Sequence, residues 1–104
     1  MAQVEHIDES SWETVIANGK VLVDFSATWC GPCRMMEPVL EQLAQDLDGV
    51  VTVAKIDVDE AQSTALKYDV TTVPTLILFH DGEVKGKVVG VKDLNSLKTF
   101  IETA

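Results

Sequence analysis

An apolar segment meets the start of an amphipathic one in the stretch Val23-Asp24-Phe25-Ser26-Ala27-Thr28-Trp29-Cys30-Gly31-Pro32-Cys33-Arg34-Met35. The segment before this junction, Lys20–Ser26, is apolar at odd and even positions alike, as in a strand covered on both faces of a sheet. After the junction, from Pro32 to Leu47, apolar residues return at helical spacing. The junction is therefore predicted to be the turn of a strand–helix unit.

The flanking sequence contains further segments with the spacing of helices and strands. Trp12, Val15 and Ile16 are spaced as on one face of a short helix, and Asp81-Gly82 signals a hairpin between two strands. Asp59 is an N-cap candidate for another short helix. The predicted elements outside the central unit are edge strand Gln3–Ile7, a helix around Trp12–Ile16, strand Val50–Val58, a helix through Ala65–Tyr68, strands Leu76–His80 and Glu83–Val89, and a helix over Leu94–Ile101.

The order of these elements predicts an α/β fold. Strands that alternate with helices form parallel pairs through crossovers, whereas the hairpin adds an antiparallel pair. We expect a single central mixed sheet of about five strands flanked by about four helices. The chain has 104 residues, of which 46% are hydrophobic, and it contains no repeat or linker, which suits a single domain over residues 1–104.

Charge and hydropathy exclude several classes of function. Eight Lys and Arg against seventeen Asp and Glu give a net charge of −9, so nucleic acids and anionic membrane surfaces repel the chain. No apolar run approaches the roughly 18 residues of a membrane-spanning helix. The N-terminal residues lack a basic leader followed by an apolar run. We expect a cytoplasmic monomer with neither a nucleic acid nor a membrane as partner.

The two cysteines, Cys30 and Cys33, have a spacing that zinc sites, structural bridges and redox pairs share. A zinc site needs two more ligands, and the two histidines, His6 and His80, lie far apart in the sequence, so no metal is expected. A permanent bridge is disfavoured in a reducing compartment. The pair is therefore predicted to be reactive.

The predicted position of the pair, at the start of a helix, favours this chemistry. Free backbone N–H groups and the positive end of the helix dipole stabilise an anion there, so the Cys30 thiolate is the predicted nucleophile. Cys33 lies one turn further on, where it can resolve a mixed disulfide on Cys30, and Pro32 suits the first helical turn. The expected reaction is dithiol–disulfide exchange.

Motifs along the whole chain resemble those of the thioredoxin family. The resemblance implies the thioredoxin fold and the reduction of disulfides in protein substrates. It also implies re-reduction by a thioredoxin reductase, so that NADPH is used only indirectly and the chain itself needs no bound cofactor. The motifs are the quoted stretch, Pro38, Lys55-Ile56-Asp57-Val58-Asp59, Val73-Pro74-Thr75, Asp81-Gly82 and Val89-Gly90.

Asp24 and Lys55 are further candidates for the site. Burial in a doubly covered strand is expected to raise the pKa of the Asp24 carboxyl toward neutrality. In the thioredoxin family the matching aspartate lies beneath the active site and assists removal of the proton from the second cysteine, here Cys33. Lys55 is implied to be its neighbour. The alternative is a buried Asp24–Lys55 ion pair that has no part in catalysis.

The resemblance also implies a substrate-docking surface around the cysteines. Val73-Pro74 matches the family's cis-proline, which faces the two sulfurs, although from sequence alone the trans peptide bond is the commoner state. Trp29 is expected to be partly exposed because it precedes the reactive cysteine in a loop. The implied docking residues are Trp29, Gly31, Pro32, Val73, Pro74, Gly90 and Val91.

Three residues, Ser26, Glu37 and Thr72, depart from the commonest family pattern. None of these departures removes a catalytic group, but Glu37 adds negative charge to the active-site helix and is expected to oppose slightly the lowering of the Cys30 pKa. The dipeptide Gly31-Pro32 is typical of reducing members of the fold family, which favours a reductase over an oxidase. A binding module that uses the same apolar face without redox chemistry is a third hypothesis, and replacing both cysteines by serine separates it from the first.

Overall fold

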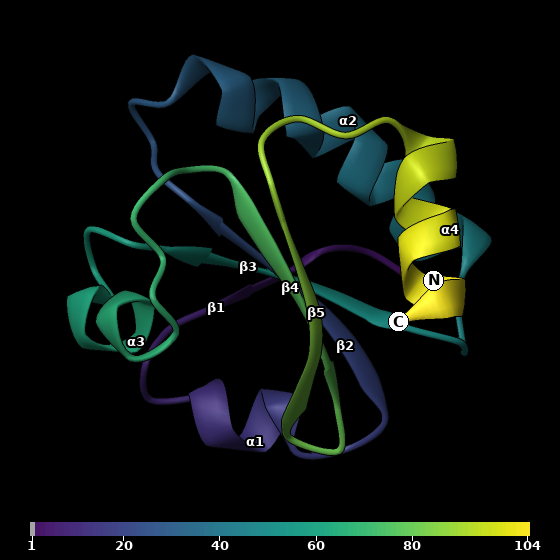
Figure 1. The fold of residues 1–104 in the computed structure, drawn as a ribbon, viewed down its shortest axis with the longest axis horizontal. Helices are drawn as coiled ribbons and strands as arrows, with labels where there is room; N and C mark the ends of the chain where they lie inside the picture. The colour runs from purple at the N-terminus through teal and green to yellow at the C-terminus, as the bar shows by residue number, and fades with distance from the viewer. Residues whose placement is uncertain (1) are drawn as a thin grey trace.

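In the computed structural model, which describes residues 2–104, five strands form one mixed sheet in the order β1-β3-β2-β4-β5 (Figure 1). Strands β1, β3 and β2 are parallel, β4 is antiparallel to β2, and β5 is antiparallel to β4. The predicted mixed sheet is therefore confirmed. The strands are β1 (Glu5–Ile7), β2 (Lys20–Ser26), β3 (Thr52–Asp57), β4 (Thr75–His80) and β5 (Glu83–Val89).

Helices cover both faces of this sheet, as Figure 1 shows, with α2 and α4 on one face and α1 and α3 on the other. Within residues 2–104 the expected four helices are all present. None of them is long and apolar enough to cross a membrane. The helices are α1 (Trp12–Ile16), α2 (Gly31–Asp46), α3 (Gln62–Lys67) and α4 (Leu94–Thr103).

Strand β2 is the centre of the core because its side chains alternate between the two covered faces. Val23 and Phe25 pack with Trp12 in the cluster beneath α1 and α3. Leu22 packs with Met36 in the cluster beneath α2 and α4. Side chains of a strand alternate from face to face, so Asp24 shares the α2 face with Leu22. This explains why the strand is apolar at both parities and where its single carboxyl group points.

The prediction that Asp59 caps α3 is wrong. The residue at the N-cap position is Ala61, and no side chain of the helix start caps it. The Glu9 carboxylate, distant in sequence, accepts the Thr64 backbone N–H at 2.9 Å and the Thr64 hydroxyl at 2.7 Å instead. The Asp59 carboxylate is engaged elsewhere, where it accepts the indole N–H of Trp29 at 2.8 Å. The start of α3 is therefore stabilised by the long-range contact with Glu9 and not by a neighbouring side chain.

The topology brings two distant parts of the chain to one edge of the sheet. Because β2 and β4 are antiparallel, the end of β2 lies beside the start of β4, with Phe25 opposite Thr75. The chain leaves β2 after Ser26 and enters α2 at Gly31, and Pro38 does not break that helix. The loop before α2 and the residues before β4 therefore face each other, and they carry the candidate site.

Candidate active site

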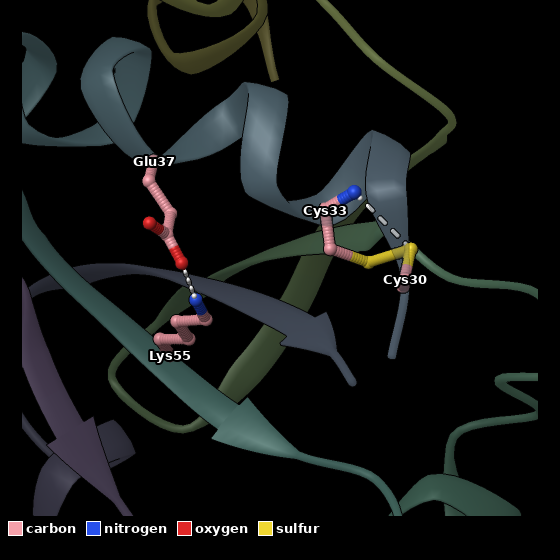
Figure 2. A network of polar contacts seen from close by, with 4 residues as sticks. All are labelled: Cys30, Cys33, Glu37 and Lys55. Carbon is pink, nitrogen blue, oxygen red and sulfur yellow. Dashed lines mark hydrogen bonds and ion pairs between the residues drawn. A yellow bond between two sulfur atoms is a disulfide. The ribbon is translucent and has the colours of Figure 1, made fainter. Parts of the chain in front are cut away.

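Cys30 is the N-cap residue of α2, and its side chain acts as the cap. Its backbone is extended, at φ −89° and ψ 113°, and its Sγ accepts the backbone N–H of Cys33 at 3.1 Å (Figure 2). Pro32, which has no N–H to satisfy, occupies the first turn. The helix therefore aims a donor and the positive end of its dipole at this sulfur, and both features stabilise a thiolate there.

The two cysteines are joined by a disulfide bond, with their Cα atoms 5.2 Å apart. Both residues are buried, and they form a small apolar cluster with Ala27, against which Val58 and Val73 pack. The sulfur of Cys30 lies 3.9 Å from the Val73 carbonyl oxygen. The pair is therefore largely shielded from bulk water, with Val73 packed against it.

The Val73–Pro74 peptide bond is cis, as the resemblance implies. The backbone N–H of Gly90 donates to the Pro74 carbonyl at 2.9 Å, which ties the end of β5 to the start of β4. Val73 contacts the cysteine cluster on its other side. Val73 is thus held next to Cys30, and the residues after β5 are tied to Pro74 beside it, although both segments are far from Cys30 in sequence.

Apolar side chains surround this approach. Trp29 is 66% exposed and Val91 is 43% exposed, whereas Val73 is half-buried and Pro74 is buried. Gly31 is exposed beside the disulfide. A groove of about 380 Å³ next to Trp29 is lined by Trp29, Val58, Val70, Thr71, Thr72 and Val73. Of the seven docking residues expected from the sequence, Trp29 lies in the loop before α2, and Gly31 and Pro32 lie in the first turn of that helix. Val73 and Pro74 lie just before β4, and Gly90 and Val91 just after β5.

Asp24 lies on the face of β2 that α2 covers and has almost no access to solvent. Its side chain is 1% exposed, and neither carboxylate oxygen has a hydrogen-bond partner among residues 2–104. Burial raises the pKa of the Asp24 carboxyl to about 7, while Lys55 lowers it and Glu37 raises it. The expected direction is confirmed, and the cause is desolvation of the charged form. A carboxyl group with such a pKa exchanges its proton near neutral pH.

Lys55 is the partner of Asp24 across β2 and β3, but its charge is directed elsewhere. Its Nζ forms an ion pair with the Glu37 carboxylate of α2 at 3.0 Å, as Figure 2 shows. The expected proximity of Lys55 and Asp24 is confirmed. The alternative, a closed Asp24–Lys55 ion pair, is not formed. Glu37, noted in the sequence only as a departure from the family pattern, is the carboxylate that pairs with Lys55.

Two other contacts at the site escaped prediction. Asp59 holds the exposed Trp29 indole, although the sequence suggested a capping role for it. The thioether Sδ of Met36 accepts the backbone N–H of Lys92 at 3.3 Å and so anchors the loop after Gly90 to α2. Neither contact leaves a signal in the sequence, because each joins residues brought together only by the fold.

The family model described as thioredoxin matches residues 3–103. A thioredoxin of Staphylococcus epidermidis is 50% identical over 96 residues, and one of Staphylococcus saprophyticus is 51% identical over the same length, with 92% of each chain covered in both cases.

Solved structures agree with these relatives. A point-mutant thioredoxin from Halobacterium salinarum superposes with a TM-score of 0.90 at 48% identity, over 97% of this chain and 89% of the other. A chain from a structure on thiol resolution in a yeast mitochondrial 1-Cys peroxiredoxin through glutathione and thioredoxin systems gives a TM-score of 0.86 at 35% identity, over 97% and 95% of the two chains.

Proposed function

The chain belongs to the thioredoxin family and is a thiol–disulfide oxidoreductase, and from this premise we propose how its residues divide the reaction. The observation that carries the proposal is the placement of Cys30 at the N-cap of α2, with its sulfur accepting the Cys33 N–H. Of the two sulfurs, this one is better placed to exist as a thiolate. Cys30 is the attacking residue and Cys33 the resolving one.

In the first step the Cys30 thiolate attacks one sulfur of a substrate disulfide. A new bond forms between Cys30 Sγ and that sulfur, the substrate S–S bond breaks, and the other substrate sulfur leaves as a thiolate that takes a proton from water. The backbone around Val73 and Pro74, next to the Cys30 sulfur, supports an extended substrate segment in this step. The apolar groove beside Trp29 receives its side chains.

In the second step Cys33 releases the substrate. Its thiol gives a proton to the Asp24 carboxylate, directly or through water, and the resulting thiolate attacks Cys30 Sγ. The Cys30–Cys33 disulfide forms, the mixed disulfide breaks, and the second substrate thiolate leaves. The protein dithiol has then lost two electrons, and the substrate disulfide has gained them. Asp24 suits this step because its pKa is near neutrality.

A thioredoxin reductase is the proposed source of electrons. It returns two electrons, drawn from NADPH, to the Cys30–Cys33 disulfide, so this chain needs no cofactor of its own. The chain acts as a monomer, because each step uses residues of one chain. The proposed compartment is the cytoplasm, which suits a protein whose only two cysteines form the redox pair.

The test is the reduction of insulin disulfides, driven by dithiothreitol or by a reductase with NADPH. The wild type accelerates precipitation of the insulin B chain, and Cys30→Ser does not, because the attacking thiolate is gone. Cys33→Ser retains the first step and accumulates a mixed disulfide with its substrate, which non-reducing electrophoresis detects. Equal rates for wild type and Cys30→Ser, or trapping by Cys30→Ser in place of Cys33→Ser, would contradict the assigned roles.

A further inference from the structure

Glu37, Lys55 and Asp24 form an incomplete charge network beside the redox pair. Figure 2 shows Glu37 on α2, one turn beyond Cys33, reaching toward Lys55 on β3. The Glu37 carboxylate and the Lys55 ammonium are 3.0 Å apart, and their side chains are 53% and 18% exposed. The network therefore runs from the protein surface inward, but no ion pair joins Lys55 to Asp24.

The separation of β2 and β3 does not explain why Asp24 and Lys55 are not in contact. Asp24 and Lys55 are aligned partners on adjacent parallel strands and share the face beneath α2. Neighbouring strands lie about 4.8 Å apart, well within the length of a lysine side chain. The carboxylate oxygens of Asp24 nonetheless lack a hydrogen-bond partner in the described chain. The Lys55 ammonium pairs instead with the Glu37 carboxylate.

Other charged groups near Asp24 do not account for this arrangement. The strand on its other side, β4, places Leu76 opposite Asp24. A cleft of about 430 Å³ beside the ion pair contains further charges, but Lys55 and Glu37 are the two that act on Asp24. The charged or titratable side chains lining this cleft and the smaller one beside it are His6, Arg34, Glu37, Glu41, Lys55, Asp57 and Glu60.

We propose that Glu37 is a positioning residue for the buried acid: by holding the Lys55 ammonium toward the surface, it keeps this counter-ion out of direct contact with Asp24. The inference rests on the proposed function where it concerns turnover. A carboxyl group without direct contact to its counter-ion keeps a higher proton affinity, so Asp24 is a stronger base for the Cys33 thiol. Glu37 thereby sets the pH at which the rate of the resolving step reaches half of its maximum.

The test is Glu37→Gln, which preserves the shape of the side chain and removes its charge. Lys55 is then free to turn toward Asp24. The titration midpoint of the Asp24 carboxyl carbon, followed by ¹³C NMR in the oxidised protein, falls by roughly half a pH unit or more, a loss of about threefold in proton affinity. Release of a mixed disulfide in single-turnover kinetics shifts its acid limb to lower pH by a similar amount.

Two further variants separate positioning from a general charge effect. Glu41→Gln removes the same charge one turn further along α2, from an exposed residue without an ion pair to Lys55 in the described chain, and leaves the Asp24 midpoint unchanged. Lys55→Met removes the group through which Glu37 acts. In that background Glu37→Gln shifts the midpoint by less than half as much as in the wild type. Circular dichroism verifies that each variant is folded.

Several results would overturn the proposal. These are an unmoved Asp24 midpoint in Glu37→Gln, an equal fall in Glu41→Gln, or an undiminished shift when Lys55 is absent. Because the titration is read at the carboxyl group, it does not depend on turnover. A shifted midpoint with an unmoved acid limb supports the positioning by Glu37 and instead overturns the role of Asp24 as the base.

Discussion

Asp24 is a carboxyl group whose environment opposes its charge. It is enclosed by the core, it has no hydrogen-bond partner among residues 2–104, and the nearest cation is engaged by Glu37. A buried carboxylate under these conditions is destabilising, and a fold retains such a group only where another requirement outweighs stability. At the scale of single residues, the requirement proposed here is proton transfer from Cys33.

The cost of this carboxylate gives a prediction for Asp24→Asn. The folded-state pKa is raised from 3.8 to about 7, so the native protein holds its proton more tightly than the unfolded chain, and stability falls as the pH rises through this interval. At about 1.4 kcal/mol per pH unit, the full cost above pH 7 is roughly 4 kcal/mol. Asparagine carries no charge and escapes this pH-dependent cost.

The measurement is urea unfolding of the oxidised wild type and Asp24→Asn at about pH 5 and about pH 8. The difference in unfolding free energy in favour of the variant grows by about 2–3 kcal/mol between these two conditions. The buried amide has its own cost, but that cost does not vary with pH, so the growth is the diagnostic quantity. A difference that is the same at both pH values would show that Asp24 is not desolvated in the folded protein.

At the scale of elements, two kinds of sequence signal predicted strand bounds correctly. Lys20–Ser26 has the predicted bounds because both faces of this strand are covered and its residues are apolar at both parities. Glu83–Val89 is mostly exposed, and it has the predicted bounds because Asp81-Gly82 and Gly90 mark its two ends. The strand predicted over Val50–Val58 begins only at Thr52, since the backbone N–H groups of Val50 and Val51 donate to the Leu47 carbonyl at the end of α2. Local pattern does not reveal how far a helix end extends.

Some residues of the candidate site were predicted from the sequence, whereas their tertiary contacts were not. Cys30, Cys33 and Asp24 are evident from the sequence because each is chemically conspicuous where it stands. The partners of Lys55 and Trp29 are not, since surface carboxylates are numerous in a chain with seventeen Asp and Glu. Which of them pairs with which cation or indole is decided by the packing of α2 and β3, a property of the tertiary structure.

The N-terminus of α4 offers a prediction at this scale. Asp93 is its N-cap, and its carboxylate accepts the Ser96 backbone N–H at 2.8 Å, which lowers the pKa of Asp93. A carboxyl group with a depressed folded-state pKa stabilises the protein above its unfolded value, 3.8, and the contribution is lost as the pH falls through the folded value. Asp93→Ala therefore lowers the thermal midpoint near neutral pH.

Thermal unfolding at about pH 7 and about pH 3 tests this cap. The gap between wild type and Asp93→Ala narrows at the lower pH, where protonation weakens the acceptor. Asp93→Asn is the matched control, because its amide oxygen also accepts a hydrogen bond from the helix but does not titrate. The thermal midpoint of Asp93→Asn therefore lies above that of Asp93→Ala by the same amount at both pH values. A wild-type advantage that does not depend on pH would contradict the role of the carboxylate.

At the scale of the whole molecule, two apolar clusters lie on opposite faces of one sheet. The cluster around Trp12 lies beneath α1 and α3, and the cluster around Leu97 beneath α2 and α4. Both clusters draw residues from β2 and β4, the two central neighbours in the sheet. Loss of either cluster exposes a face of these strands, so the two layers depend on each other.

This dependence predicts that residues 1–104 unfold as a single cooperative domain. In a Trp29→Phe variant, Trp12 is the sole indole and reports on the α1 and α3 face through fluorescence. Far-ultraviolet circular dichroism is dominated by the two longer helices, α2 and α4. The two signals share one midpoint and one slope in urea under non-reducing conditions. Separate transitions would show that the two layers fold independently.

The half-exposed position of Glu37 has a consequence for how such proteins diverge. Core residues are difficult to exchange because their neighbours must be repacked, but a side chain at the surface is replaced freely. If one surface carboxylate governs the basicity of an interior acid, a substitution at position 37 alone changes the pH at which the resolving step operates. The same position gives a designer a means to adjust recycling speed while the core, the cysteines and the docking loops stay as they are.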